Sequence, residues 1–471
     1  MTEDWVEAVL SRKMGQAGVG AATIGAFLEA HRLVRAGDRG LIPESEIAPV
    51  ENLPGWEALE SHGERGRSEL GRLVVIKLNG GLGTGMGLDR TKSLIRVRGE
   101  ESFMDFIARQ ILYWRGQTGG EAPRFLLMNS FSTRGETLSF LERYPEIMAG
   151  GPVDFLQSKV PKIWAENLEP AEWPADPDLE WCPPGHGDFY PSLLNSGLLD
   201  RLLEAGVRYA FISNSDNLGA TVDLGLLGYF AATEKSFVME VAERTAADRK
   251  GGHLARRLSS GRLLLRESAQ YAPQDEATFQ DIARHRYFNT NNLWLRLDHL
   301  AASLKESGGV IRLPIITNLK TVDPRDPNSG KVIQLESAMG AAIETFEQTG
   351  AVRVPRSRFS PVKSTSDLLV LRSDACEVTP DHRLVLAAGR RGQPPVVDLD
   401  AKHYKRLSDF EALFPGAVPS LLGCDSLKVE GPVRFGSGVV CEGRVEFRNA
   451  GPSPATVAPG VYRDSNVELG K

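Results

Sequence analysis

The clearest hydrophobic pattern in this chain is a series of short apolar runs separated by segments of helical periodicity. The first run, Leu73–Ile76, is apolar at every position, which is typical of a parallel strand buried on both faces. A helical pattern follows it, with an apolar face made of Phe103, Ile107, Ile111 and Trp114. Further apolar runs lie at 124–128, 209–212 and 237–241. This alternation predicts a doubly wound α/β domain over residues 72–385.

The segment before this domain has a different character. Apolar residues recur at helical spacing from Trp5 to about Arg35, and the stretch 43–71 has the Pro and Gly content of a connection. The pattern therefore predicts a helical segment and a connection over residues 1–71.

The segment after the domain has short β-branched runs between Gly and Pro turns. Apolar positions about six residues apart, at Leu427, Val433, Val439 and Val445, favour the coils of a short β-helix over residues 386–471. A flat fragment of a β-sandwich is the alternative. From Gly451 onwards the composition predicts an irregular or interacting tail.

Composition and charge exclude several classes of protein. Hydrophobic residues make up 41% of the chain and charged residues 25%, as in ordinary globular proteins. The net charge is -6, with Lys and Arg spread along the chain, so no footprint for nucleic acid is present. No apolar stretch approaches the roughly 18 residues of a membrane span. The acidic N-terminus does not resemble a signal peptide, and the scattered cysteines predict reduced thiols. We expect a cytoplasmic protein without nucleic-acid or membrane partners.

A glycine-rich loop follows the first buried strand, with the sequence LNGGLGTGMGLDRTKS over residues 78–93. Its glycines suit backbone with φ > 0 and a close approach of N–H groups to phosphate oxygens. Met86 and Leu88 stand where a dinucleotide fingerprint needs its third glycine, and Thr91 stands where the Walker A motif needs a glycine. A strand, a glycine loop and Lys92 suit instead the transfer of a nucleotidyl group to a sugar phosphate, in which the enzyme positions the reactants and neutralises charge.

Six motifs occur in order along most of the chain: LNGGLGT at 78–84, PGHGD at 184–188, NSDNLG at 214–219, FNTNNLW at 288–294, LESAMGAAI at 335–343 and VPRSRFSPVK at 354–363. With these motifs the sequence resembles the eukaryotic-type UTP–glucose-1-phosphate uridylyltransferase (UDP-glucose pyrophosphorylase) family. The resemblance implies a Rossmann-like, GT-A-like nucleotidyltransferase domain with a mixed sheet and helices on both faces, followed by a left-handed β-helix. It also implies that UTP and glucose 1-phosphate give UDP-glucose and pyrophosphate, by in-line attack on the α-phosphorus with Mg²⁺.

The resemblance assigns roles to matching residues. Lys92 and Lys363 would meet the reacting phosphates, and Asp216, just after the apolar run that ends at Ile212, would hold Mg²⁺. The residues implied to bind the nucleotide are Leu78, Asn79, Gly80, Gly81, Gly83, Thr84, Gln157 and Gly187, with the amide of Gln157 on the uracil edge. Those implied to bind the sugar phosphate are His186, Asn214, Glu240, Asn291, Asn292 and Glu336. We expect the last four of these at strand ends or a helix start.

Without the resemblance, ordinary structural roles compete with these assignments: surface ion pairs for the two lysines and turn positions for Asp216 and the asparagines. The chain also departs from the family pattern, with RTKS at 90–93 where GPKS is common and SAM at 337–339 where TAA is usual. These departures leave the choice of sugar open. Two alternatives therefore stand: a pyrophosphorylase for N-acetylglucosamine 1-phosphate or several sugar 1-phosphates, and a non-catalytic nucleotide-sensing or assembly protein. Self-association through the C-terminal domain also stays open.

Overall fold

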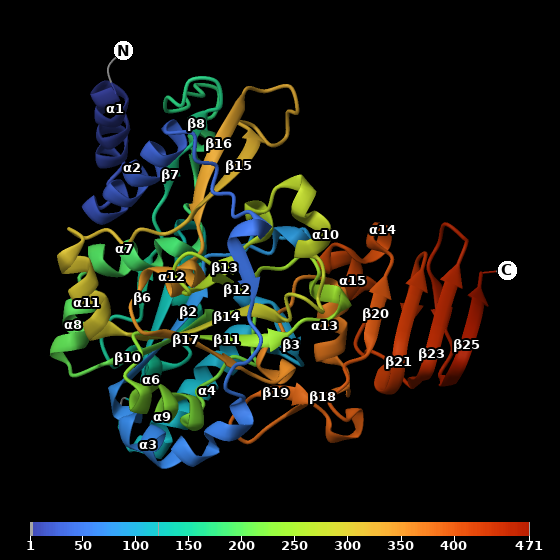
Figure 1. Cartoon of the computed structure of the whole chain (residues 1–471). Helices are drawn as coiled ribbons and strands as arrows, with labels where there is room; N and C mark the ends of the chain where they lie inside the picture. The colour runs from blue at the N-terminus through green and yellow to red at the C-terminus, as the bar shows by residue number, and fades with distance from the viewer. Residues whose placement is uncertain (1–2, 121, 471) are drawn as a thin grey trace.

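A ten-stranded mixed sheet forms the centre of the computed structural model, which describes residues 3–120 and 122–470 (Figure 1). The outermost residues of the first and last predicted segments, 1–2 and 471, lie outside this description. The strands of the sheet are β1 (Ile47–Pro49), β2 (Leu73–Asn79), β5 (Arg124–Asn129), β6 (Asp154–Leu156), β10 (Tyr209–Asn214), β11 (Phe237–Glu243), β12 (His253–Arg257), β13 (Leu263–Arg266), β14 (Tyr287–Arg296) and β17 (Thr349–Arg353).

The order of these strands combines a parallel block with antiparallel neighbours. The main path is β1-β12-β14-β10-β2-β5-β6, while β11 joins β14 to β17 and β13 pairs with β12. Strands β10, β2, β5 and β6 are mutually parallel, as are β11 and β17. Strand β14 runs antiparallel to both β10 and β11 and so connects the two parallel blocks. The apolar runs predicted as strands at 73–76, 124–128, 209–212 and 237–241 are confirmed.

Both faces of the sheet carry a hydrophobic layer. On β2, Leu73 and Val75 belong to one buried cluster, and Val74 and Ile76 belong to the other. The first cluster includes residues of α4 (Phe103–Thr118), α9 (Leu224–Thr233) and α13 (Thr365–Arg372). The second includes residues of α7 (Phe189–Asn195), α8 (Leu198–Glu204), α11 (Leu297–Glu306) and α12 (Ala342–Thr345). The prediction of a mixed sheet with helices on both faces is therefore confirmed.

The N-terminal part forms a separate layer with a small second sheet. Helices α1 (Glu3–Gln16) and α2 (Ala21–Arg35) share a buried cluster with β15 (Ile315–Thr321) and β16 (Lys331–Ser337) (Figure 1). Strand β8 (Ile163–Trp164) pairs with β16, and β7 (Val160–Pro161) pairs with β9 (Trp181–Cys182). Helix α3 (Gly63–Glu69) and strand β1 lie within the predicted connection, and β1 joins the central sheet.

Several shorter elements complete the part of the chain before residue 387. They are β3 (Arg96–Arg98), β4 (Glu101–Ser102), α5 (Phe131–Leu141), α6 (Pro145–Met148), α10 (Glu276–Phe279), β18 (Cys376–Val378) and β19 (Leu384–Leu386). Among the residues that the structure describes, no helix combines the length and the apolar character needed to cross a membrane.

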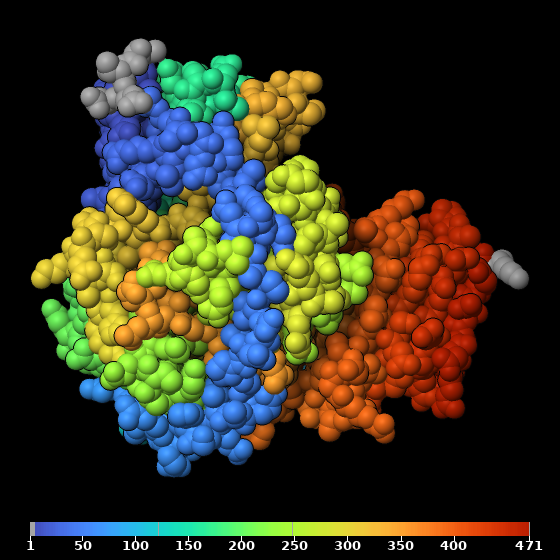
Figure 2. Space-filling model, in the orientation of Figure 1, coloured from blue at the N-terminus to red at the C-terminus, as the bar shows by residue number. Residues whose placement is uncertain are grey.

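The C-terminal part is a stack of parallel strands that projects from one side of the molecule (Figures 1 and 2). One sheet contains β20 (Val396–Leu399), β21 (Ser420–Glu430), β23 (Val439–Asn449) and β25 (Gly460–Leu469), and the helices α14 (Ala401–Tyr404) and α15 (Leu407–Leu413) lie between β20 and β21 in the sequence. A second contains β22 (Val433–Phe435) and β24 (Ala455–Val457). All of these pairs are parallel, which excludes the flat antiparallel sandwich. The residues at the six-residue spacing, Leu427, Val433, Val439 and Val445, are buried between the sheets.

One prediction about this region was wrong. The segment from Gly451 is not an irregular tail, because β24 and β25 occupy most of it and β25 pairs with β23 over nearly its whole length. The Gly and Pro residues that suggested irregular backbone are concentrated in the turn at 450–454, before β24 begins.

Candidate active site

Two loops leave the central sheet side by side at the carboxyl ends of parallel strands. The glycine loop follows β2, and a second loop that carries Asp216 follows β10. These strands are neighbours, with Leu78 opposite Asn214 at their ends. The carboxyl edge of such a sheet is where open α/β proteins bind ligands. The position predicted for Asp216, just beyond a strand end, is confirmed.

The glycine loop folds back on itself as a hairpin. The N–H of Gly83 donates to the carbonyl of Arg90 at 3.1 Å, and the N–H of Lys92 donates to the carbonyl of Gly81 at 3.2 Å. These bonds bring Lys92 back beside the end of β2. The expectation that the glycines use φ > 0 holds only for Gly87, with φ +70°. Gly80 serves a different need, because a Cβ there would lie 2.8 Å from Oε1 of Gln157.

An ion pair joins the two loops. Nζ of Lys92 lies 2.5 Å from Oδ2 of Asp216, and the two side chains are 19% and 17% exposed. The segment with Lys363 lies along the other side of Asp216, since the N–H of Val362 donates to the Asp216 carbonyl at 3.3 Å. The carbonyl of Lys363 is also close to Gly85, 3.7 Å from where a Cβ would stand. The structure therefore places Lys92, Asp216 and Lys363 on adjoining loops.

The predicted nucleotide residues also gather at this edge. Nε2 of Gln157 donates to the carbonyl of Gly185 at 3.0 Å, while its Oε1 faces Gly80. Thr84 and Gly81 are exposed on the loop. Gly187 is packed so closely against Ser337 that a Cβ would lie 2.2 Å from its Oγ. The side chain of Gln157 thus lies between the glycine loop and the Gly-His-Gly segment.

Asn79 and Leu78, both predicted to bind the nucleotide, make hydrogen bonds within the protein. Nδ2 of Asn79 donates to Oδ1 of Asn129 at 2.8 Å and to Oγ1 of Thr137 at 3.0 Å, so this amide ties β2 to β5 and α5. The carbonyl of Leu78 accepts from the N–H of Ser215 at 3.0 Å and so joins the two loops. These three hydrogen bonds stabilise the edge of the sheet that carries the two loops.

His186 is held in one orientation as a neutral ring. Its Nδ1 accepts the N–H of Met339 at 2.9 Å, so the proton of the neutral imidazole lies on Nε2. Burial lowers the pKa of His186 to about 4, and the ring is therefore uncharged at neutral pH. It can donate one hydrogen bond through Nε2 without carrying charge.

Asn214 and Asn291 form a pair beside the Asp216 loop. Nδ2 of Asn291 donates to Oδ1 of Asn214 at 2.9 Å. Asn291 lies in the middle of β14 and not at the expected strand end, in a bulge where the pairing with β11 shifts register, and its φ of +59° is left-handed. Its own Oδ1 is buried and has no hydrogen-bond partner among the described residues. A buried acceptor without a partner is costly, which favours a ligand donor at this point.

Glu240 and Asn292 lie deeper than the sequence suggested. Both are fully buried in the middle of strands and not at strand ends. Glu240 accepts from Arg358 through both oxygens at 2.7 Å, from Nε1 of Trp294 at 2.9 Å and from Nδ2 of Asn292 at 3.1 Å. Oδ1 of Asn292 accepts from Asn217 at 3.3 Å. These contacts occupy the carboxylate of Glu240 and place it below the surface of the site.

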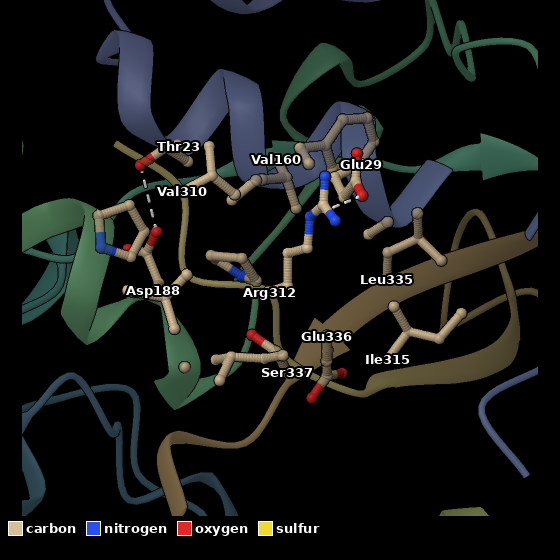
Figure 3. Close-up of a pocket in the computed structure, with 18 of the residues that line it drawn as sticks. Thr23, Glu29, Val160, Asp188, Val310, Arg312, Ile315, Leu335, Glu336 and Ser337 are labelled. Atoms are coloured by element: carbon tan, nitrogen blue, oxygen red, sulfur yellow. Dashed lines mark hydrogen bonds and ion pairs between the residues drawn. The ribbon is translucent and has the colours of Figure 1, made fainter. Parts of the chain in front are cut away.

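Glu336 is the one acidic residue found near a strand end as expected, close to the end of β16. Its Oε1 accepts from Nδ2 of Asn318 at 2.9 Å, and burial raises the pKa of its carboxyl. With Ser337 it lines a cavity of about 250 Å³ under α2, opposite Asp188 (Figure 3). Gly187 also lines this cavity, which therefore lies directly behind the Gly-His-Gly segment.

Comparison with known proteins agrees with this arrangement. The family model for UTP–glucose-1-phosphate uridylyltransferase matches residues 29–442. The chain belongs to this family. The UTP–glucose-1-phosphate uridylyltransferase of Solanum tuberosum is 40% identical over 414 residues, which cover 87% of this chain and 81% of that protein. The predictions of the family and of the enzyme class, a nucleotidyltransferase, are confirmed.

Solved structures of the family show the same fold. A mutant of the UDP-glucose pyrophosphorylase from Leishmania major, in complex with UDP-glucose, is 45% identical and superposes with a TM-score of 0.92, covering 99% of this chain and 100% of that one. The UDP-glucose phosphorylase from Trypanosoma brucei is 48% identical with a TM-score of 0.87, over 99% of this chain and 100% of that one. The N-terminal layer and the C-terminal stack are therefore part of the shared fold.

The structure of this uridylyltransferase family member adds a candidate that sequence reasoning missed. Glu267 directly follows β13, and burial raises the pKa of its carboxyl, while Asn289 and the charge of Lys363 oppose that shift. Glu267 is therefore a half-buried carboxylate with Lys363 among its charged neighbours. An acidic residue just after the apolar run Leu263–Leu265 was the available signal, and no motif pointed to it.

Proposed function

We propose that this chain joins UTP and glucose 1-phosphate to give UDP-glucose and pyrophosphate. One observation carries the proposal: the ammonium of Lys92, returned by the glycine loop, meets the carboxylate of Asp216 at the carboxyl edge of the sheet. Family membership supports the reaction, as does the UDP-glucose bound in the related Leishmania structure. The contact of Lys92 with Asp216, with the segment of Lys363 beside them, argues against a protein that has lost catalysis.

The proposed reaction needs no covalent intermediate with the protein. A phosphate oxygen of glucose 1-phosphate attacks the α-phosphorus of UTP in line, a new P–O bond forms, and the bond to the pyrophosphate group breaks. Loop amides in the segment 80–84 other than that of Gly83, which is bonded to Arg90, neutralise charge on the phosphates together with Lys92 and Lys363. Neutral His186 donates through Nε2 to a phosphate oxygen. Gln157, between Gly80 and Gly185, selects uracil through its amide.

We propose that Asp216 also binds Mg²⁺. Nucleotide enzymes hold this ion with one or two carboxylates, the substrate phosphates and water. The donor set fits, since Asp216 presents one partly exposed carboxylate beside the phosphate loop. In the described part of the chain no group of three or more His, Cys, Asp or Glu is arranged to hold a metal, so the phosphates must complete the site. When bound, Mg²⁺ neutralises charge on the triphosphate.

The sugar phosphate is assigned to the asparagine pair. Asn214 and Asn291 offer polar groups at the site, and the unpartnered Oδ1 of Asn291 can accept from a sugar hydroxyl. Glu336 can contribute from the end of β16. Glu240 and Asn292, which the sequence also assigned to the sugar, support this edge from below through the Arg358 network.

The test of the function is a substrate panel. Purified protein with Mg²⁺ and UTP should release pyrophosphate with glucose 1-phosphate faster than with galactose 1-phosphate or N-acetylglucosamine 1-phosphate. Equal or faster release with another sugar phosphate would replace the assignment. Lys363→Ala should lower turnover far more than UTP affinity, because charge stabilisation grows in the transition state.

Three features of organisation belong to the same proposal. We assign the segments 1–71, 72–385 and 386–471 to an N-terminal unit, a GT-A-like catalytic domain and a left-handed β-helix. The parallel strands β21, β23 and β25 support the last assignment.

Because β25 ends the stack, its outer edge offers a surface for self-association, which size-exclusion chromatography tests. The four free, buried cysteines are consistent with a reducing, cytoplasmic setting.

A further inference from the structure

Lys77 is a fully buried lysine in β2, directly beneath the candidate site. Its side chain lies inside the sheet and the residue is 1% exposed. Nζ donates to Oγ of Ser213 at 2.8 Å and to the carbonyl of Ala220 at 2.6 Å. Ser213 is the penultimate residue of β10, and Ala220 follows the turn beyond it. A single ammonium group thus connects the two ends of the segment 214–219, which carries Asp216.

The backbone hydrogen bonds in the upper part of this segment are mostly long, whereas its side chains have closer partners: Lys92 lies 2.5 Å from Asp216, and the amide of Asn291 donates to Asn214 at 2.9 Å. The N–H of Asn217 donates to the carbonyl of Asn214 at 3.3 Å, and the Asp216 carbonyl accepts from Val362 at 3.3 Å. Only Ser215, whose N–H donates to Leu78 at 3.0 Å, has a backbone bond of ordinary length to β2. The two bonds of Lys77, at 2.8 and 2.6 Å, are therefore shorter than the backbone hydrogen bonds of the segment and hold its two ends.

A charge at this position is expensive for folding. Among the described residues Lys77 forms no ion pair, and its partners are a hydroxyl and a carbonyl. Burial lowers the pKa of Lys77 to about 7, and Arg358 lowers it further, while Glu240 and Asp216 raise it. An apolar side chain of similar length would avoid this cost. The lysine is better explained by the two hydrogen bonds that it donates at the ends of the loop above.

We propose that Lys77 is a positioning residue: by clamping Ser213 and Ala220 it fixes the segment 214–219 and so holds the Asp216 carboxylate where Lys92 and the phosphates need it. The inference rests on the proposed uridylyl transfer for its kinetic consequence. The clamp itself rests only on the contacts of Lys77.

Lys77→Met tests the clamp, with Lys162→Met as the matched control. Lys162 is also buried, at 4% exposed, and its Nζ also donates to a backbone carbonyl, that of Val322 at 3.0 Å, but it lies between β7 and β8. For Lys77→Met we expect kcat to fall about 30-fold with the KM for UTP changed less than about threefold, because the displaced group acts mainly in the transition state. Lys162→Met should keep both values.

Hydrogen exchange gives a readout that does not depend on activity. The amides of 214–220 should exchange faster in Lys77→Met, with other amides of the sheet unchanged, and no such change should appear in Lys162→Met. If Lys77→Met keeps full kcat and unchanged exchange in this segment, the inference is wrong. If wild type and Lys162→Met make no UDP-glucose, the proposed function fails, while the exchange experiment still decides on the clamp.

Ser213→Ala covers the case in which Lys77→Met does not fold. It removes one acceptor of the ammonium and leaves the charge in place. We expect the same direction of change, with kcat lowered about fivefold and faster exchange at 214–220, since one of two hydrogen bonds is lost. A Ser213→Ala variant with unaltered kcat and exchange would overturn the role of Lys77.

Discussion

Lys92 and Asp216 are in contact at 2.5 Å although 123 residues lie between them in the sequence. Their meeting depends on two backbone features: the parallel pairing of β2 with β10, and the hairpin that returns the glycine loop to the end of β2. Each group neutralises the other before any ligand is present. The unliganded site therefore does not bury an unpaired charge. On binding, a polyphosphate can replace Asp216 as the partner of Lys92, and a cation can replace Lys92 as the partner of Asp216.

Replacing Lys92 by Met should abolish most activity with little effect on stability. The ion pair is partly exposed, so its loss costs about 1 kcal/mol or less, whereas loss of a phosphate-binding charge should reduce kcat/KM by about 100-fold or more. Steady-state kinetics and thermal unfolding measure the two effects.

Lys13→Met is the matched control for this variant. Nζ of Lys13 lies 2.5 Å from Oε2 of Glu180, with exposed fractions of 19% and 14% that nearly equal those of the Lys92 pair. We expect a similar small change in melting temperature and unchanged kinetics. Equal losses of activity in both variants would show that the effect comes from general destabilisation.

Glu240→Ala should strongly destabilise the protein. The substitution leaves the guanidinium of Arg358 buried without its partner and removes acceptors from Trp294 and Asn292. Breaking one side of a buried ion pair costs about 3–5 kcal/mol. Denaturant unfolding should show this loss, and Glu57→Ala, which removes the exposed partner of Arg353, should show a much smaller one.

The same residue separates a structural role from direct sugar binding. Glu240→Gln keeps the shape of the side chain and some of its acceptors. If the sugar touches Glu240, this variant should raise the KM for glucose 1-phosphate while its stability stays near that of wild type. A large loss of stability with unchanged KM would instead support the role below the site that its four contacts indicate.

The sequence was sufficient where the fold depends on local pattern. The apolar run before Asp216 placed this residue at a strand end, and the glycines after β2 located the loop of Lys92. The sequence was not sufficient to predict the role of Glu240, because its partner Arg358 is 118 residues away. A carboxylate in the middle of a strand has the same local sequence pattern whether it is paired or free. Long-range partners of this kind follow from the sheet order, which no local pattern specifies.

Backbone irregularities were also invisible in the sequence. The bulge at Asn291 gives this residue a left-handed backbone inside β14, yet the segment FNTNNLW looks like a turn to a residue-by-residue analysis. At the C-terminus, the content of Gly and Pro predicted an irregular tail, but the structure has strand β25 there. The strand forms because parallel pairing with β23 outweighs local propensity.

Asn291→Gly should weaken sugar binding selectively. Glycine adopts the left-handed backbone of this position without strain, so the variant removes the amide alone. Losing one hydrogen bond of about 1.4 kcal/mol should raise the KM for glucose 1-phosphate about tenfold and leave the KM for UTP unchanged. Asn291→Ala adds backbone strain and should also lower stability. A Gly variant with an unchanged sugar KM would exclude this contact.

A stacked pair of buried histidines should make the fold sensitive to acid. The rings of His253 and His285 lie 3.9 Å apart, at an angle of 20°. Burial, then the neighbouring His285 and Arg244, lowers the pKa of His253 well below its usual value. Burial also lowers the pKa of His285, although Glu44, at 3.0 Å from its Nε2, partly opposes this. The ring of His253 is therefore neutral in the folded state.

The sign of the effect follows from proton binding. Below about pH 6.5 the unfolded chain binds a proton at His253 and the folded chain does not, so this contribution to stability is present above that pH and is lost as the pH falls. One such histidine costs about 2 kcal/mol between pH 7 and pH 5. His253→Phe retains a stacking ring that does not titrate, and His403→Phe, at a partly exposed site on α14, is the control. The decrease in melting temperature from pH 7 to pH 5 should be smaller in His253→Phe than in wild type and unchanged in His403→Phe. An equal decrease in all three proteins would mean that His253 does not set the acid sensitivity.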